Sequence, residues 1–240
     1  MKLTFLGTSH GLPEKDRYCS CTMIDINGRK YLVDAGAPFV NMLIRRDIQL
    51  CDLKAIFITH LHGDHTNGLP EFVDLISWYY KDVNTAMLLP EQIGVDALKL
   101  WNNAANGNNT RALDFRVYKE GAIYDDGTVK VTAMPTKHGN GNTYAFMLEA
   151  EDKRVVFTGD IAGYANDTPK VCFERECDAI VGEGAHVSFE EAKDVFERCL
   201  TNRIIISHVA PRNECALARL QAEEKSYSLT VAYDGYETKV

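Results

Sequence analysis

The residues that could do chemistry gather in one short segment. Three of the seven histidines and one aspartate fall within six consecutive positions, His60-Leu61-His62-Gly63-Asp64-His65. On extended backbone, residues two apart point to the same side, so His60 and His62 can hold one metal ion. Gly63 allows a sharp turn, after which Asp64 and His65 project towards a second ion. Imidazoles and a carboxylate suit zinc, so we predict a metal site here rather than a solvated loop.

Three further residues of ligand type each follow a predicted strand. They are His138 after Val129–Met134, Asp160 after Arg154–Thr158 and His208 after Arg203–Ser207. Each one alone would more often be an ordinary polar residue at a strand end. Because sites in sheet proteins commonly lie where strands end, the three together are expected to complete a two-metal centre.

Hydrophobic periodicity indicates strands followed by helices in each half of the chain. In the first half we expect strands at Lys2–Leu6, Cys21–Ile26, Lys30–Asp34, Lys54–Thr59 and Thr85–Leu89, and helices at Pro38–Arg46, Leu69–Lys81 and Ile93–Ala104. In the second half we expect strands at Asp114–Tyr118, Val129–Met134, Thr143–Glu149, Arg154–Thr158, Ala179–Val181, Arg203–Ser207 and Ser228–Val231, and helices at Phe189–Leu200 and Asn213–Glu223. Asn27-Gly28 indicates a hairpin turn, and Asn102–Asn109 is typical of a helix end and surface loop.

This pattern alone supports an α/β or α+β fold in a single domain over residues 1–240. The chain has no internal repeat and no linker rich in proline, glycine or serine. Two αβ halves with their sheets face to face would form a four-layer αββα sandwich. That four-layer arrangement depends on the motifs rather than on the periodicity.

Composition excludes several classes of protein. With 26 basic and 34 acidic side chains in 240 residues, the net charge of −8 argues against a general duplex-DNA binder, although a local basic pocket remains possible. The chain lacks an apolar run of about 18 residues and opens on a strand and turn, so we expect no membrane span or signal peptide. Seven cysteines without a CxxC pair favour reduced thiols in the cytoplasm. Cys19 and Cys21 could bind a metal, but we favour two strand residues on one face.

The sequence THLHGDH resembles the His-x-His-x-Asp-His motif of the metallo-β-lactamase fold superfamily of metal-dependent hydrolases, and the resemblance runs from about Leu3 to the C-terminus. It implies one metal on His60, His62 and His138, another on Asp64, His65 and His208, and a bridge through Asp160. Asp34, in YLVDAG, matches the aspartate that supports the ligand histidines from behind. The resemblance implies two divalent ions, with zinc as the first choice and manganese or iron as the alternatives. Two such ions would lower the pKa of a shared water to about 7, and the resulting hydroxide would be the nucleophile.

Four details resemble the ribonuclease Z-like branch, which cleaves phosphodiesters. The motif continues as HTNGLP at His65–Pro70, and the chain opens with FLGTSHGLP. Residues Pro13–Tyr18 resemble that branch's Pro-x-Lys-x-Arg-Asn loop, with tyrosine in place of the asparagine. His186 resembles the histidine that acts near the scissile phosphate. Glu183 lies where the branch has a His-Glu-Ala-Thr stretch, which in this sequence is compressed together with the segment that contains His186. We take Asp64, His186 and Glu183 as the catalytic candidates.

The resemblance also implies how a phosphodiester would be handled. Hydrolysis expels an alkoxide, which is a poor leaving group, and the imidazolium of His186 could protonate it, an effect worth about 10²–10⁴-fold. Lys15 and Arg17 could hold phosphate oxygens, and His10 could line the pocket. Each assignment has an alternative. Lys15 and Arg17 could lie in a solvated charged loop, and His10 could be an inert loop histidine. His186 could begin a helix and have no role.

The substrate is expected to be small. Members of this branch that process tRNA carry a long flexible arm, in some of them between the positions of His138 and Asp160, which are only 22 residues apart here. We therefore expect a compact phosphodiesterase for a small diester, a cyclic nucleotide or a nucleic-acid end, with tRNA 3′-end processing as the alternative. A hydrolase of a lactam, lactone or thioester and a binding module that keeps metal only for its fold are the other hypotheses. The sequence does not report the oligomeric state, although a homodimer is common in the branch that it resembles.

Overall fold

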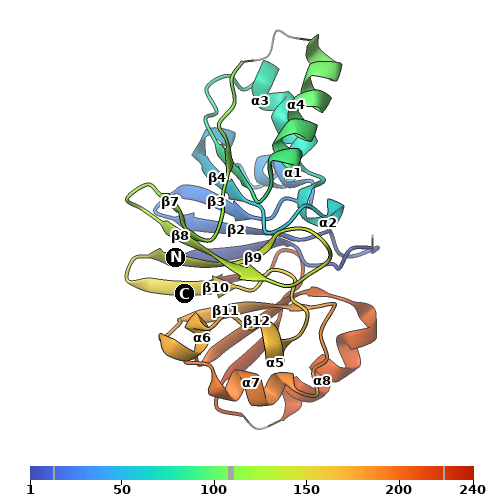
Figure 1. Cartoon of the computed structure of the whole chain (residues 1–240), viewed down its shortest axis with the longest axis vertical. Coiled ribbons are helices and arrows are strands. Elements are labelled where there is room, and N and C mark those ends of the chain that lie inside the picture. Colours follow the sequence, from blue (N-terminus) through green and yellow to red (C-terminus); the bar gives the residue numbers. More distant parts are fainter. Residues whose placement is uncertain (13, 108–110, 224) are drawn as a thin grey trace.

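Two mixed β-sheets lie face to face, and helices cover the outer face of each (Figure 1). The computed structural model describes residues 1–12, 14–107, 111–223 and 225–240. The first sheet has the strand order β14-β1-β2-β3-β4-β5-β6, and the second has the order β13-β12-β11-β10-β9-β8-β7. This arrangement confirms the four-layer αββα sandwich.

The first sheet is built mainly from the N-terminal half. Its strands are β1 (Lys2–Gly7), β2 (Cys21–Ile26), β3 (Arg29–Val33), β4 (Leu53–Phe57), β5 (Ala86–Leu89), β6 (Phe115–Val117) and β14 (Glu237–Lys239). The helices on this side are α1 (Phe39–Ile44), α2 (Gly63–Thr66), α3 (Leu69–Trp78) and α4 (Gln92–Asn106), with a 3₁₀ turn at Leu50–Asp52. Because β14 pairs with β1, the C-terminal tail returns to the sheet in which the chain began.

The second sheet and its helices follow in chain order. Its strands are β7 (Gly121–Asp125), β8 (Lys130–Thr136), β9 (Thr143–Ala150), β10 (Lys153–Phe157), β11 (Ala179–Gly184), β12 (Arg203–Val209) and β13 (Ser228–Val231). The helices are α5 (Tyr164–Asp167), α6 (Val171–Glu174), α7 (Ala192–Arg198) and α8 (Glu214–Ala222), with a 3₁₀ turn at Pro211–Asn213. They lie below the sheet in Figure 1.

Apolar side chains from both sheets form one core between them. Phe5, Phe57, Phe146 and Val155 are fully buried in it, and further cores lie beneath the helices on each outer side. The parallel strands β4 and β12 are therefore covered on both faces, which explains the apolar runs Ala55–Phe57 and Ile204–Ile206 within them. Their ends deliver the polar residues of the site.

The structure corrects several predicted boundaries. Helix α3 ends at Trp78 rather than Lys81, and α7 covers Ala192–Arg198 rather than Phe189–Leu200. Strands β7 and β14 were not predicted, since β7 is largely exposed and β14 has only three residues. The predicted loop at Asn102–Asn109 is helical to Asn106, and its positions 108 and 109 lie outside the described residues.

Other expectations match the structure. The hairpin at Asn27-Gly28 joins the antiparallel strands β2 and β3, and both turn residues have a positive φ. Cys21 lies buried in β2, and no metal-ligand group among the described residues includes it or Cys19. None of the helices in the described part of the chain combines the length and apolar character that a membrane crossing requires.

Candidate metal centre

Histidines and aspartates from both sheets meet where the strands end. His60 and His62 follow β4, and Asp64 and His65 lie in the short helix α2, which begins directly after His62. From the second sheet come residues that follow β8 and β10 or lie within β12, namely His138, Asp160 and His208. All seven residues implied by the family motif therefore converge at one edge of the sandwich.

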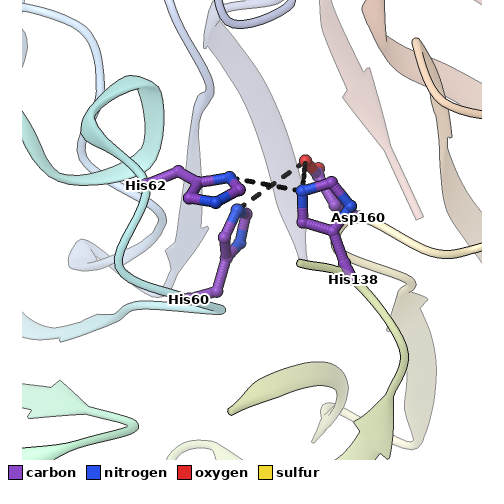
Figure 2. Close-up of side chains that lie close together, drawn as sticks. All are labelled: His60, His62, His138 and Asp160. Atoms are coloured by element: carbon purple, nitrogen blue, oxygen red, sulfur yellow. Dashed lines mark hydrogen bonds and ion pairs between the residues drawn. The ribbon is translucent and has the colours of Figure 1, made fainter. Parts of the chain in front are cut away.

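The first group consists of His60, His62, His138 and Asp160, shown in Figure 2. Each offers one ligand atom, and these atoms lie within 4.8 Å of one another. His138 Nε2 lies 3.2 Å from His62 Nδ1, and Asp160 Oδ2 lies 3.7 Å from His60 Nε2. The side chains point at a common centre as ligands of one ion would.

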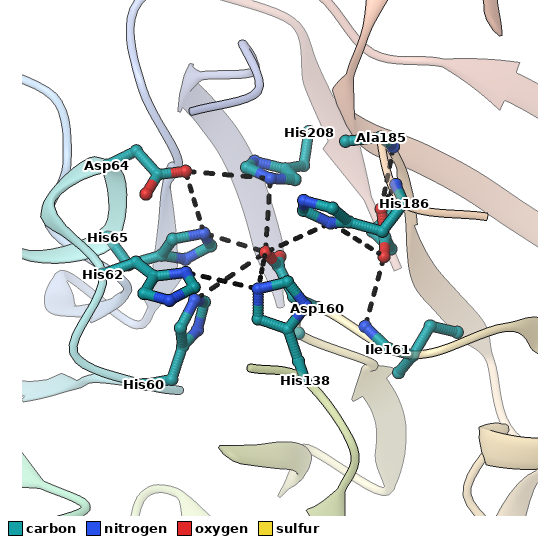
Figure 3. A network of polar contacts seen from close by, with 12 residues as sticks. His60, His62, Asp64, His65, His138, Asp160, Ile161, Ala185, His186 and His208 are labelled. Carbon is teal, nitrogen blue, oxygen red and sulfur yellow. Dashed lines mark hydrogen bonds and ion pairs between the residues drawn. The ribbon is translucent and has the colours of Figure 1, made fainter. Parts of the chain in front are cut away.

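The second group consists of Asp64, His65 and His208. Asp64 Oδ2 lies 3.4 Å from His65 Nε2 and 3.8 Å from His208 Nε2. Asp160 reaches this group too, with Oδ1 at 3.5 Å from His65 Nε2 and Oδ2 at 3.4 Å from His208 Nε2 (Figure 3). Its carboxylate therefore lies between the two groups, where a bridging ligand must be.

Buried polar atoms without hydrogen-bond partners show that the cluster fits metal ions. These atoms are His60 Nε2, His65 Nε2, Asp160 Oδ2 and both ring nitrogens of His208. Leaving a buried polar atom unpaired costs about 1–3 kcal/mol, so several together in one place need another partner. A divalent cation satisfies nitrogen and carboxylate atoms at once.

The electrostatics keep two of the histidines and both acids of the cluster in forms that bind metals. Burial and the neighbouring His65 lower the pKa of His60 to about 2, so its imidazole is neutral. Burial also lowers the pKa of His138. Burial alone would raise the pKa values of Asp64 and Asp160, but the adjacent histidines outweigh it, and both pKa values lie below the usual range. The acids are therefore carboxylates.

Asp34 lies behind the cluster and contacts both His65 and Thr59. Its Oδ2 lies 2.7 Å from His65 Nδ1, and its Oδ1 accepts hydrogen bonds from the backbone amide and hydroxyl of Thr59 at 2.8 and 3.0 Å. Asp34 is buried and has a φ of 59°, so the backbone turns sharply after β3 to place it. Fixing Nδ1 of His65 leaves Nε2 facing the cluster.

Close backbone approach seats α2. A Cβ added at Gly36 would lie 1.7 Å from the carbonyl oxygen of Asp64, so only glycine fits there. The amide of Ala35 donates a 2.8 Å hydrogen bond to the carbonyl of His65. The segment after β3 thus packs directly against α2, the helix that carries Asp64 and His65.

His186 lies at the edge of the cluster and is held by Glu183. The buried carboxylate of Glu183 accepts hydrogen bonds from the amides of Ala185 and His186, both at 2.8 Å, and from Ile161 at 3.1 Å. Its Oε1 also lies 3.3 Å from His186 Nδ1, and this contact raises the pKa of His186. His186 Nδ1 is 3.4 Å from Asp160 Oδ2, so Asp160, His186 and His208 form a third group with ligand geometry, which the sequence did not indicate.

The residues predicted to hold phosphate make their described contacts with residues other than the candidate metal ligands. His10 Nδ1 lies 2.9 Å from Glu14 Oε1, and Lys15 is exposed. Arg17 lies near Glu214 of α8 at 3.9 Å, rather than in contact with the ligand histidines. Position 13, the first residue of the predicted loop, lies outside the described residues.

Sequence reasoning missed residues that support the site indirectly. Thr59 holds Asp34, and Glu14 holds both His10 and Ser9. Asp234 in the C-terminal sequence AYDG binds the backbone of the N-terminal loop. No signal in the sequence pointed to this role of Asp234, because nothing there indicated that the two ends of the chain meet.

The fold and this site together define a metallo-β-lactamase-fold protein. A family model described as anti-Pycsar protein Apyc1 matches residues 1–216, and the chain belongs to this family.

Individual relatives agree with that placement. The chain is 33% identical over 157 residues to a ribonuclease Z of Shouchella clausii, which covers 64% of this chain and 49% of the relative. The chain thus spans about half the length of the curated relatives it matches. Among solved structures, human tRNase Z, short form, has a TM-score of 0.78 at 20% identity and covers 100% of this chain and 99% of its own. The metallo-β-lactamase fold protein YhfI from Bacillus subtilis has a TM-score of 0.78 at 17% identity, with 99% of each chain covered. These likenesses support the fold.

Proposed function

We propose that this protein is a metal-dependent phosphodiesterase with a dinuclear centre. One observation carries the proposal: six ligand-type side chains from two sheets lie around the buried carboxylate of Asp160, the seventh. In the proposed centre His60, His62 and His138 hold one ion, and Asp64, His65 and His208 hold the other. Two bound divalent ions would supply an activated water and neutralise charge that develops on the phosphorus oxygens.

His186 is the proposed proton donor to the leaving oxygen. Its side chain is 37% exposed, so it can reach a substrate, and Glu183 both orients the ring and favours the imidazolium. Glu183 itself is buried and occupied by three backbone amides, so it acts through His186. Asp64 is held by His65 and His208 in the position of a ligand.

The space beside the centre supports a small substrate. A hollow of about 470 Å³ borders His138 and His186, and its lining includes Lys137 and Asn140. That volume lies within the usual range of about 300–1,000 Å³ for small-molecule sites. Residues 138–160 form a loop and the paired strands β9 and β10, and no arm extends from this part of the described chain. A small diester or a cyclic nucleotide is therefore the proposed substrate.

The identity of the metal, the cellular location and the oligomeric state are part of the same proposal. Zinc is the first choice of metal from the nitrogen and oxygen donors, with manganese or iron as alternatives. Seven cysteines without a disulfide support a cytoplasmic location. A homodimer stays a prediction.

The test uses the metal-loaded protein and compares two kinds of substrate that differ in their leaving group. Wild type and His186→Ala are assayed on bis(p-nitrophenyl) phosphate, whose leaving group needs little protonation, and on a panel of cyclic nucleotides, whose leaving group is an alkoxide. We expect kcat on the cyclic nucleotides to fall about 10²–10⁴-fold and kcat on the activated diester to fall much less. Lys193→Ala, which removes a surface cation paired with Glu223, is the control. Wild type that binds two metals and hydrolyses no diester would refute the proposal.

A second candidate is an endonuclease acting at an RNA 3′ end. The relatives named ribonuclease Z favour it, although the match covers about half of their length. The same preparation is assayed on a precursor tRNA. Cleavage of the RNA together with silence on the cyclic nucleotides would favour this candidate, whereas hydrolysis of a lactone or thioester alone would favour chemistry at carbon.

A further inference from the structure

The carboxylate of Asp234 holds both ends of the loop formed by residues 8–12 and 14–18, here called the N-terminal loop. Asp234 Oδ1 accepts hydrogen bonds from the amide and the hydroxyl of Thr8, at 2.9 and 2.8 Å. Its Oδ2 accepts a 2.6 Å hydrogen bond from the amide of Tyr18. One side chain thus binds donors that are ten positions apart, and the loop between them is closed at its base.

Asp234 is itself fixed by the fold. It lies in the tail between β13 and β14, where the amide of Ala232 donates to Ile206 and the amide of Gly235 donates to Phe5. These two bonds attach the tail to one strand of each sheet. The carboxylate therefore comes from a segment that is attached to the two sheets on either side of it, independently of the loop that it binds.

The closed loop lies against the metal centre. A Cβ added at Gly11 would be 3.3 Å from Asp64 Oδ2, so the loop backbone passes over that carboxylate. The carbonyl of Thr8 accepts a 2.9 Å hydrogen bond from the amide of Val209, the residue after the ligand candidate His208. The position of the loop is thus tied to both Asp64 and His208.

The loop bears the cationic and imidazole side chains that the sequence assigned to substrate binding. His10, Lys15 and Arg17 all lie between the two ends that Asp234 holds. His10 contacts Glu14 of the same loop at 2.9 Å, and Arg17 makes only long contacts, at 3.5 Å from the Thr8 hydroxyl and 3.9 Å from Glu214. Their placement beside the centre therefore depends on how firmly the base of the loop is closed.

We propose that Asp234 is a positioning residue for substrate binding, which acts by clamping the N-terminal loop onto the metal centre. This inference rests on the proposed phosphodiesterase function, since it gives the loop a substrate to hold. Asp234 touches neither the substrate nor the ligand cluster; it acts through Thr8 and Tyr18.

Asp234→Asn tests the clamp with almost no change in shape. The amide oxygen can still accept from Thr8, but the NH₂ group faces the amide of Tyr18, so two donors oppose each other. We expect backbone amide exchange, measured by NMR or mass spectrometry on the metal-loaded protein, to quicken about ten-fold or more around Tyr18 and less around Thr8. Asp234→Ala removes all three bonds and should quicken exchange at both ends, where the Ser9 amide still donates a 2.8 Å hydrogen bond to the carbonyl of Tyr18. Glu237→Gln is the control, because it removes an acid from the same tail that pairs with Lys2.

Kinetics then separate positioning from general stability. We expect Asp234→Asn to raise KM for a diester about ten-fold, with kcat changed less than about three-fold and with two metals still bound. Unchanged exchange in both Asp234 variants would overturn the clamp. Faster exchange with an unchanged KM would overturn its role in substrate binding. If wild type hydrolyses no diester, the proposed function fails, whereas the clamp is still judged by the exchange measurement, which needs no substrate.

Discussion

Asp34→Asn should weaken metal binding at one half of the centre. Asp34 Oδ2 contacts His65 Nδ1 at 2.7 Å, and its Oδ1 accepts two hydrogen bonds from Thr59. The backbone tolerates the change, because asparagine adopts the positive φ of this position readily. The fold should therefore survive, and the effect on the metal can be measured in a native protein.

The magnitude follows from the two ways in which the new amide can lie. If its NH₂ group donates to His65 Nδ1, the ring proton moves to Nε2, the atom that faces Asp64 and Asp160 and that a metal needs unprotonated. If its oxygen stays on His65, the NH₂ group opposes the amide of Thr59, at a cost of about 1–3 kcal/mol. Loss of such a supporting partner typically costs about 10–100-fold in metal affinity, or about 1.4–2.7 kcal/mol.

The assay is a competition titration with a chromophoric chelator, which resolves the two binding steps. We expect one of the two dissociation constants to rise by about 10–100-fold and the other to stay nearly constant. Asp25→Asn is the control, because Asp25 accepts from Lys30 and Gly28 in the same sheet, away from the cluster. Equal affinities in wild type and Asp34→Asn at both steps would refute the role of Asp34 in orienting His65.

Two further predictions concern pH. Because Glu183 raises the pKa of His186, the imidazolium persists to higher pH, and kcat on a cyclic nucleotide should fall as pH rises through that pKa. His186→Ala should lack this descending limb in a pH–rate profile, and a limb of the same shape in the variant would contradict the assignment. Asp126→Asn should destabilise the fold by about 1.5–3 kcal/mol at neutral pH. Burial opposes ionisation of Asp126, but the amides of Val129 and Thr128 and the Tyr31 hydroxyl outweigh it and lower its pKa. The stability difference, measured by urea unfolding, should therefore disappear as pH falls through that lowered pKa, and a difference that stayed constant in acid would contradict this reasoning.

The candidate ligands could be selected from the sequence because they are adjacent in the chain or lie at strand ends. His60, His62, Asp64 and His65 are adjacent in the chain, and the apolar sequence before them had to be a buried strand. His138 and Asp160 follow segments whose alternation or apolar character marks strands. Neither inference needs knowledge of how the two sheets pack.

What the sequence could not predict depends on contacts between distant segments. The short strand β14 exists because β1 offers it a partner, and its three residues have no periodicity of their own. Arg17 lies near Glu214, more than 190 positions away, which no local pattern indicates. The role of Asp234 is of the same kind, since it requires both termini to meet at the sheet edge.

The division of the ligands between the sheets has an energetic consequence. The first sheet and its helix α2 supply His60, His62, Asp64 and His65, and the second sheet supplies the rest. Several of these atoms are buried without partners, so in the protein alone the cluster opposes close docking of the two edges. Bound ions would make the contribution of the cluster to folding favourable, because a ligand that binds only the folded state stabilises it. The stabilisation is about 2.7 kcal/mol when the free ligand concentration is 100 times the dissociation constant. The same ions that would serve the chemistry would therefore also join the two sheets, and the apolar core between the sheets holds the candidate ligands close enough for that to happen.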